Sequence, residues 1–111
     1  MAAVYHAQEN YEKALEYYEK ALAIKEKVLG KAHPSTATTY NNMGLVYSSQ
    51  KNYEKALEYF KKAHQVFLSV FGEDHPNTQN TVVNIMVTEL LQETDMTEDE
   101  LMKIFENPTL E

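Results

Sequence analysis

The feature that most constrains this chain is an internal repeat with a period of 42 residues. Residues 11–17 recur without change as residues 53–59. The same offset relates further pairs: Gly30 and Gly72, His33 and His75, and Pro34 and Pro76. A period of this length is typical of arrays in which each unit is one supersecondary structure that buries its apolar face against its neighbours. The repeat therefore predicts a stacked array before any single residue is interpreted.

Each period predicts two helices, and the second of them covers residues 53–71. Its apolar positions recur at helical spacing: Tyr53, Ala56, Leu57, Phe60, Ala63, Phe67 and Val70. Asn52 is expected to cap its start, and Gly72 to end it in a left-handed conformation. Pro76 suits the first turn of the next helix, where its missing N–H costs nothing.

The other helix of the period is predicted from about Pro34 to Gln50. Tyr40, Met43, Gly44 and Tyr47 follow helical spacing in this segment. A glycine inside a helix costs about 1 kcal/mol relative to alanine. Gly44 therefore suggests that another helix approaches closely at this position, where small residues against large ones shorten the distance between helix axes.

These residues resemble the signature of the tetratricopeptide repeat family. The matching positions are Tyr40, Met43, Gly44, Tyr47, Tyr53, Ala56, Phe60 and Ala63. The period of 42 residues is similar to the variant found in kinesin light chains, which also occurs in unrelated proteins. The resemblance implies an all-α fold, in which antiparallel helix-turn-helix repeats stack as a short right-handed α-solenoid fragment.

The register of the repeat divides the chain into parts. Residues 1–33 form a partial repeat, in which residues 1–8 match only the back half of a first helix. Residues 34–75 form a complete repeat, and residues 76–92 form the first helix of a third. Whether Met1 is a native start stays open. The repeat pattern is lost over 93–111, where a capping box ahead of apolar residues predicts a short helix at 97–106. We expect this helix to cap the apolar face of residues 76–92.

The charge of the chain lies in its tail. The net charge is −7, of which residues 1–92 contribute −1 and residues 93–111 contribute −6. No clustered basic face is available for phosphates, so nucleic acid is a poor partner. No apolar run approaches the roughly 20 residues that span a bilayer, and there is no cysteine. We expect no membrane partner and take a cytoplasmic location as the default.

The resemblance implies that the first helices line a concave groove for an extended or helical peptide. Carried over by position, the expected peptide-binding residues are Thr38, Asn41, Asn42, Leu45, Ser48, Ser49, Asn80, Val83, Asn84 and Val87, with Leu91, Ala3, His6 and Ala7 beside them. None of them is Lys or Arg, so a neutral or mixed-charge peptide is expected. Asn42 and Asn84 occupy equivalent positions and can form a ladder along a peptide backbone. The alternative is that they bond neighbouring helices of the array.

The sequence shows no nucleophile–base pair, phosphate-binding loop or metal-ligand spacing. We therefore expect no enzyme, no metal and no cofactor. His33 and His75 recur beside proline at a helix start, where a local cap or turn residue belongs, and His64 is expected at the surface or in the groove. The leading hypothesis is a protein-interaction module that binds a peptide. The alternative is a spacer or self-associating segment of a longer array, in which exposed repeat ends pair with a second copy.

Overall fold

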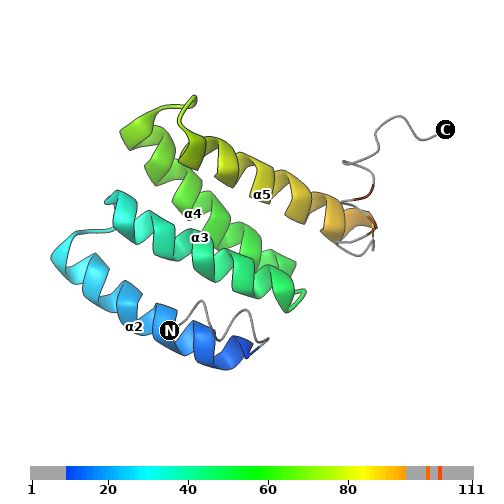
Figure 1. Cartoon of the computed structure of the whole chain (residues 1–111), viewed down its shortest axis with the longest axis horizontal. Helices are drawn as coiled ribbons and strands as arrows, with labels where there is room; N and C mark the ends of the chain where they lie inside the picture. The colour runs from blue at the N-terminus through cyan, green and yellow to red at the C-terminus, as the bar shows by residue number, and fades with distance from the viewer. Residues whose placement is uncertain (1–9, 95–99, 101–102, 104–111) are drawn as a thin grey trace.

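The computed structural model describes residues 10–94, 100 and 103 of this chain. It contains four helices over the first of these ranges: α2 (Tyr11–Val28), α3 (Pro34–Ser49), α4 (Tyr53–Phe71) and α5 (Pro76–Thr94). They follow one another in chain order, each antiparallel to the next (Figure 1). The predicted all-α repeat solenoid is confirmed, and the predicted helix bounds agree with the structure to within a residue or two.

The two types of helix begin with two different caps, and the repeat preserves both. At the start of α2 and α4, the side chains of Asn10 and Asn52 accept hydrogen bonds from the backbone N–H three residues later, at 3.4 Å in each case. Before α3, Nδ1 of His33 accepts from the N–H of Ser35 at 3.0 Å. His75 makes the equivalent bond at 3.1 Å before α5. The predicted structural role of His33 and His75 is therefore confirmed.

The ends of the helices depart from the prediction at two residues. Gly72 has a positive φ of 86°, as expected, but its ψ of 171° lies outside the left-handed helical region. That extended, positive-φ conformation is open essentially to glycine alone. Lys51 takes the left-handed conformation after α3, with φ 65°. Around it, the N–H of Asn52 bonds to the carbonyl of Tyr47 at 2.9 Å, as in a Schellman motif.

The core lies between α3 and α4, which pack most closely of the helix pairs. A Cβ atom on Gly44 would lie 2.6 Å from two ring atoms of Phe60, so only glycine permits this approach. Met43, Ala56 and Ala63 are fully buried around the contact. Small residues on one helix thus receive large residues of the other, as the sequence predicted.

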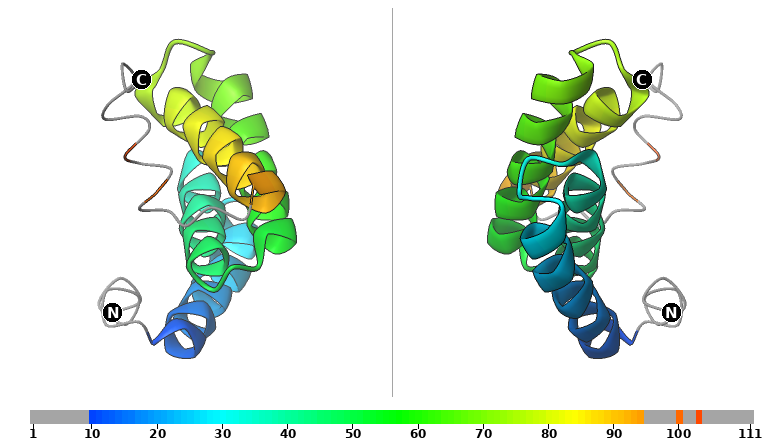
Figure 2. Two further views of the ribbon diagram at one scale, coloured as in Figure 1. Left: turned by 90° about the vertical axis from the view of Figure 1, so that its right-hand side faces the viewer. Right: turned by 90° about the vertical axis from the view of Figure 1, so that its left-hand side faces the viewer.

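The helices form an elongated stack of 52 × 33 × 21 Å. Figure 2 shows α2 at one end of the stack and α4 with α5 at the other. Only Ala14 is buried on α2, whereas four residues are buried on α4. Of the expected cap at 97–106, only Glu100 and Lys103 are described, both in helical conformation. The remainder of the cap, like Ala3, His6 and Ala7, lies outside the described residues.

Candidate functional site

The ten residues expected to bind peptide lie on α3 and α5, and they differ in how much surface they offer. Four are exposed: Thr38, Leu45, Asn80 and Val83. Four are half-buried: Asn42, Ser49, Asn84 and Val87. Asn41 and Ser48 are buried, as is the neighbouring residue Leu91. The available surface therefore comes from eight of the ten.

The two first helices are joined by a side-chain hydrogen bond. Nδ2 of Asn84 donates to Oδ1 of Asn41 at 3.0 Å, with Asn41 only 9% exposed. The sequence predicted that Asn42 and Asn84 form a ladder along a peptide, or alternatively that they bond neighbouring helices of the array. Asn84 forms a bond of the second kind, to the neighbour of Asn42. For Asn84 the structural role that the sequence left open is therefore present, whereas the side chain of Asn42 makes no hydrogen bond to the described residues.

A hollow of about 340 Å³ lies beside Asn42, and we call it the α2–α3 hollow. Thr38, Thr39 and Asn42 line it from α3. The α2 side contributes Tyr17, Tyr18, Ala21 and Lys25. Sequence reasoning placed no second-helix residue at the site, because the equivalents of these four residues on α4 were expected in the core.

Lys25 brings a positive charge to the edge of that hollow. Its Nζ donates to Oγ1 of Thr39 at 3.0 Å and to the carbonyl of Ser35 at 3.4 Å. Both acceptors are neutral, and no ion pair of Lys25 is found within the described residues. The expectation that the first helices carry no basic residue at the site holds, but the second helix supplies one.

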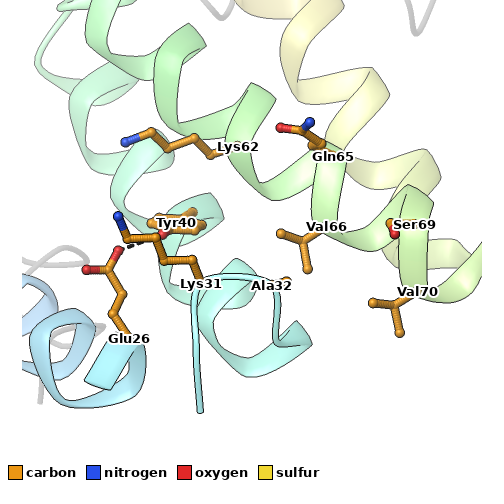
Figure 3. Close-up of a pocket in the computed structure, with 9 residues that line it drawn as sticks. All are labelled: Glu26, Lys31, Ala32, Tyr40, Lys62, Gln65, Val66, Ser69 and Val70. Atoms are coloured by element: carbon orange, nitrogen blue, oxygen red, sulfur yellow. Dashed lines mark hydrogen bonds between the residues drawn. The ribbon is translucent and has the colours of Figure 1, made fainter. Parts of the chain in front are cut away.

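A second hollow, of about 460 Å³, opens where α2, α3 and α4 meet, and we call it the Tyr40 pocket (Figure 3). Val66 and Val70 of α4 face the loop that carries Lys31 and Ala32. Such a volume is within the range of small ligand sites. The mixture of apolar wall and polar rim suits an amphipathic side chain better than a charged group alone.

The floor of the Tyr40 pocket is fixed by a short hydrogen bond. The hydroxyl of Tyr40 donates to Oε2 of Glu26 at 2.6 Å and so ties α3 to α2. Burial, together with this bond and the charge of Glu26, raises the pKa of Tyr40 well above its ordinary value of 10.0. One period later the equivalent residues are Val82 and Leu68, so this polar tie belongs to a single junction.

Lys62 borders the Tyr40 pocket beside two aromatic rings. Nζ of Lys62 lies 5.6 Å from the ring centre of Tyr40 and 5.1 Å from that of Tyr59. It also lies 3.8 Å from the carboxylate of Glu58, in a pair that is about half exposed. Exposed pairs of this kind contribute little to stability. Lys62 is therefore positioned mainly by the aromatic rings beneath it.

The remaining histidine of the described residues connects two helices. Nδ1 of His64 on α4 lies 3.1 Å from Oγ1 of Thr81 on α5, and His64 is half-buried. It was expected at the surface or in the groove, and the structure instead places it at a helix junction. Within residues 10–94, 100 and 103 no group of three possible metal-binding side chains is found. No helix in that part of the chain is long and apolar enough to cross a membrane.

Comparisons with known proteins agree with this architecture. A family model described as tetratricopeptide repeat matches residues 1–67 and 38–85. Among solved structures, the fold is similar to that of BtubC (BKLC) from P. vanneervenii, with a TM-score of 0.67 and 22% sequence identity. The match covers 87% of this chain and 44% of that one, so this chain spans less than half of that protein's length. At this identity the likeness concerns the fold alone. No curated protein matches the sequence.

Proposed function

Since this chain belongs to the tetratricopeptide repeat family, we propose that it is a protein-interaction module that holds a partner peptide against α3 and α5. Repeats of this family generally mediate protein–protein interactions and typically serve as non-enzymatic scaffolds. The observation that carries the proposal is the row of polar and small apolar side chains along the two first helices. Their exposed members are Thr38, Leu45, Asn80 and Val83.

The chemistry of this face favours a neutral or mixed-charge peptide. The sixteen residues of α3 include no Asp, Glu, Lys or Arg. Asn42 is half-buried and has no side-chain hydrogen bond within the described part of the chain, so both its donor and its acceptor can meet a peptide backbone. Leu45 and Val83 offer apolar contact beside it. Main-chain hydrogen bonds and small apolar contacts are therefore the expected source of affinity.

The test is to select peptides from a display library on the whole chain and to compare matched amide variants. Asn42→Ala should weaken a selected peptide about tenfold, the equivalent of one lost hydrogen bond of about 1.4 kcal/mol. Gln65→Ala is the control, because Gln65 is an exposed amide that lines the Tyr40 pocket. If the control weakens binding and Asn42→Ala does not, the ligand occupies the Tyr40 pocket and the proposal is wrong.

Self-association is a second candidate function, and the surface of α5 favours it. Val82, Val83 and Met86 are 39%, 54% and 53% exposed, which is a large apolar area for one helix. We propose that residues 97–106 cover this face within one chain, or that a second copy does so in a dimer. Light scattering on the whole chain separates the two, because a dimer doubles the mass of 12.8 kDa.

A further inference from the structure

The α2–α3 loop and the α4–α5 loop lie at the same edge of the stack, next to the C-terminal end of α4 (Figure 1). Lys31 of the first loop lines the Tyr40 pocket together with Val70 of α4. His75, at the end of the second loop, stacks on Phe71 of α4 with 4.0 Å between the ring centres. We call the two loops and this end of α4 the loop edge, which comprises residues 29–33 and 70–75.

The loop edge exposes apolar side chains of α4 whose surroundings are described. Val70 is 50% exposed and faces the first loop across the Tyr40 pocket (Figure 3). Phe71 stays partly exposed although it stacks on the ring of His75. Both residues therefore remain accessible with the elements beside them in place.

The repeat separates this exposure from exposure that depends on the position in the array. Ile24 on α2 is 63% exposed, whereas its equivalent Val66 on α4 is half-buried. Leu29 and its equivalent Phe71 differ little, at 43% and 39% exposed. Phe71 belongs to α4, which packs against α3 on one side and α5 on the other. The stacking of helices thus covers the Ile24 position but leaves the loop edge uncovered.

The charges of the loop edge are opposite on its two loops. Lys31 in the first loop and Glu73 in the second are repeat equivalents, and Asp74 follows Glu73. All three are exposed, and none of them forms an ion pair within the described residues. Two copies aligned in the same direction along this edge would place like charges opposite each other. With one copy turned by 180°, Lys31 of each copy lies opposite Glu73 of the other.

We propose that the loop edge is a two-fold interface between two copies of this chain, in which the first loop of each copy lies against the second loop of the other. One patch then supplies both charges and both halves of the apolar centre, as a two-fold interface requires. The pairing places Phe71 of the second copy against the Tyr40 pocket, and aromatic side chains are enriched at the centre of such interfaces. This surface is separate from the peptide-binding face of α3 and α5 and from the apolar residues of α5.

The charge pattern favours a second copy over other occupants. A different partner needs a basic segment, an apolar segment and an acidic segment at the spacing of the two loops, whereas a second copy supplies all three by symmetry. Residues 95–111 of the chain itself contain six acidic residues and one lysine. They match Lys31, but Glu73 and Asp74 repel them.

The test is sedimentation equilibrium of the whole chain over a series of concentrations. The mass of the unaltered chain should approach twice 12.8 kDa as the concentration rises. Lys31→Glu and, separately, Glu73→Lys should each weaken the dimer about tenfold, because each replaces two attractive contacts by two repulsive ones. Added salt should narrow that difference. An equimolar mixture of the two variants should associate about as tightly as the unaltered chain, because every reversed charge then faces its opposite.

Lys61→Glu is the matched control, since it makes the same change of charge at an exposed position of α4 away from the loop edge. It should leave the dimer unchanged. A chain that stays monomeric overturns the proposal, and so does a mixture that associates no better than each variant alone. Destabilisation of either variant cannot produce the recovery in the mixture, so that arm tests the contact itself.

A dimer that both charge reversals leave intact, but that Val82→Ser with Met86→Ser dissociates, uses α5 and also overturns the proposal. Self-association through α5 is measured in the Lys31→Glu chain, where the loop edge is disabled. Peptides selected on α3 and α5 are measured in the same chain and should bind as before. The proposed peptide binding and the loop-edge dimer can therefore fail independently.

Discussion

The side-chain amide of Asn84 donates a hydrogen bond to the buried side-chain oxygen of Asn41, and this bond joins the first helix of one repeat to the first helix of the next. Asn41 would otherwise bury an amide oxygen without a partner, which costs about 1–3 kcal/mol. The bond gives Asn84 a structural role in addition to any contact with a ligand. Among the two repeat-equivalent asparagines, Asn42 is therefore the better probe of binding.

This bond predicts a loss of stability when either partner is truncated. Asn84→Ala should lower the free energy of unfolding by about 1–2 kcal/mol, because Asn41 is left buried and unpaired. The double variant with Asn41→Ala should cost less than the sum of the two single variants. Urea unfolding followed by circular dichroism measures all three. Asn80→Ala, on the exposed face of the same helix, is the control and should change little.

The contact at Gly44 predicts a steric effect. Gly44→Ala places a methyl group 2.6 Å from the ring of Phe60, so it should destabilise the fold although alanine favours helices. We expect a net loss of about 1–3 kcal/mol, the usual range for overpacking. Phe60→Leu in the same chain should recover part of it. A Gly44→Ala variant with unchanged Tm would contradict the close approach.

The Tyr40–Glu26 bond predicts how stability changes with alkaline pH. The pKa of Tyr40 is raised above 10.0, so the folded state holds the phenol proton more tightly than the unfolded state does. This tighter binding of the proton stabilises the folded state, and the stabilisation is fully present at pH values below the pKa of Tyr40 in the unfolded chain. It is lost as the pH rises from there toward the pKa of Tyr40 in the folded chain. Tm should therefore fall as the pH rises through about 10.

Tyr40→Phe separates this effect from the general response to alkali. It should lower Tm at neutral pH by removing the donor to Glu26, and it should flatten the alkaline decline. Burial also raises the pKa of Tyr59 and that of Tyr18, so part of the decline should persist. Tyr53→Phe serves as the control for loss of a phenol elsewhere. An alkaline decline unaltered by Tyr40→Phe would exclude Tyr40 as its source.

Two equivalent threonines predict opposite outcomes for the same substitution. Oγ1 of Thr36 donates to the carbonyl of Gly30 at 2.8 Å, whereas Oγ1 of the buried Thr78 has no hydrogen-bond partner among the described residues. Thr36→Val should cost about 1–2 kcal/mol, because it removes a buried hydrogen bond. Thr78→Val should be neutral or stabilising, because burial of a hydroxyl group without a hydrogen bond is unfavourable and valine has no such group. Thermal melts of the two variants provide the comparison.

The exposed apolar side chains of α5 predict a concentration-dependent change in mass. Removal of residues 95–111 should increase self-association if that segment covers Val82 and Met86. Val82→Ser with Met86→Ser should reverse the increase. Light scattering at several concentrations measures both. A shortened chain that stays monomeric at high concentration would leave no role for the segment as a cover.

Periodicity accounts for how much of the fold could be predicted. Helix bounds and caps are local properties, so Asn52, His33 and Pro34 could be interpreted from their own neighbourhood and from their recurrence. The close helix approach at Gly44 could be predicted because a glycine inside a helix is destabilising and is expected only where packing requires it. The left-handed Lys51 gave no such signal, because its conformation is set by the turn between α3 and α4 rather than by its side chain.

The candidate site was less predictable, because its contacts do not follow the period. The repeat aligns Asn84 with Asn42, but the two first helices meet so that Asn84 reaches Asn41. Tyr40 and Glu26 likewise pair at one junction and have apolar equivalents at the next. A repeat predicts which positions are equivalent, whereas contacts between repeats depend on how far one unit is shifted and rotated against the other.

The order of the helices in space has a consequence for how the chain acquires its structure. Each described helix packs mainly against the helix before or after it in the sequence, so the main helix–helix contacts do not wait for a distant segment. Contacts of short sequence separation are typical of rapid folding, and each pair can assemble as soon as both of its helices have left the ribosome. The α3–α4 pair has packed neighbours on both sides, so its amide hydrogens should exchange most slowly with solvent, and opening should spread inward from α2 and α5.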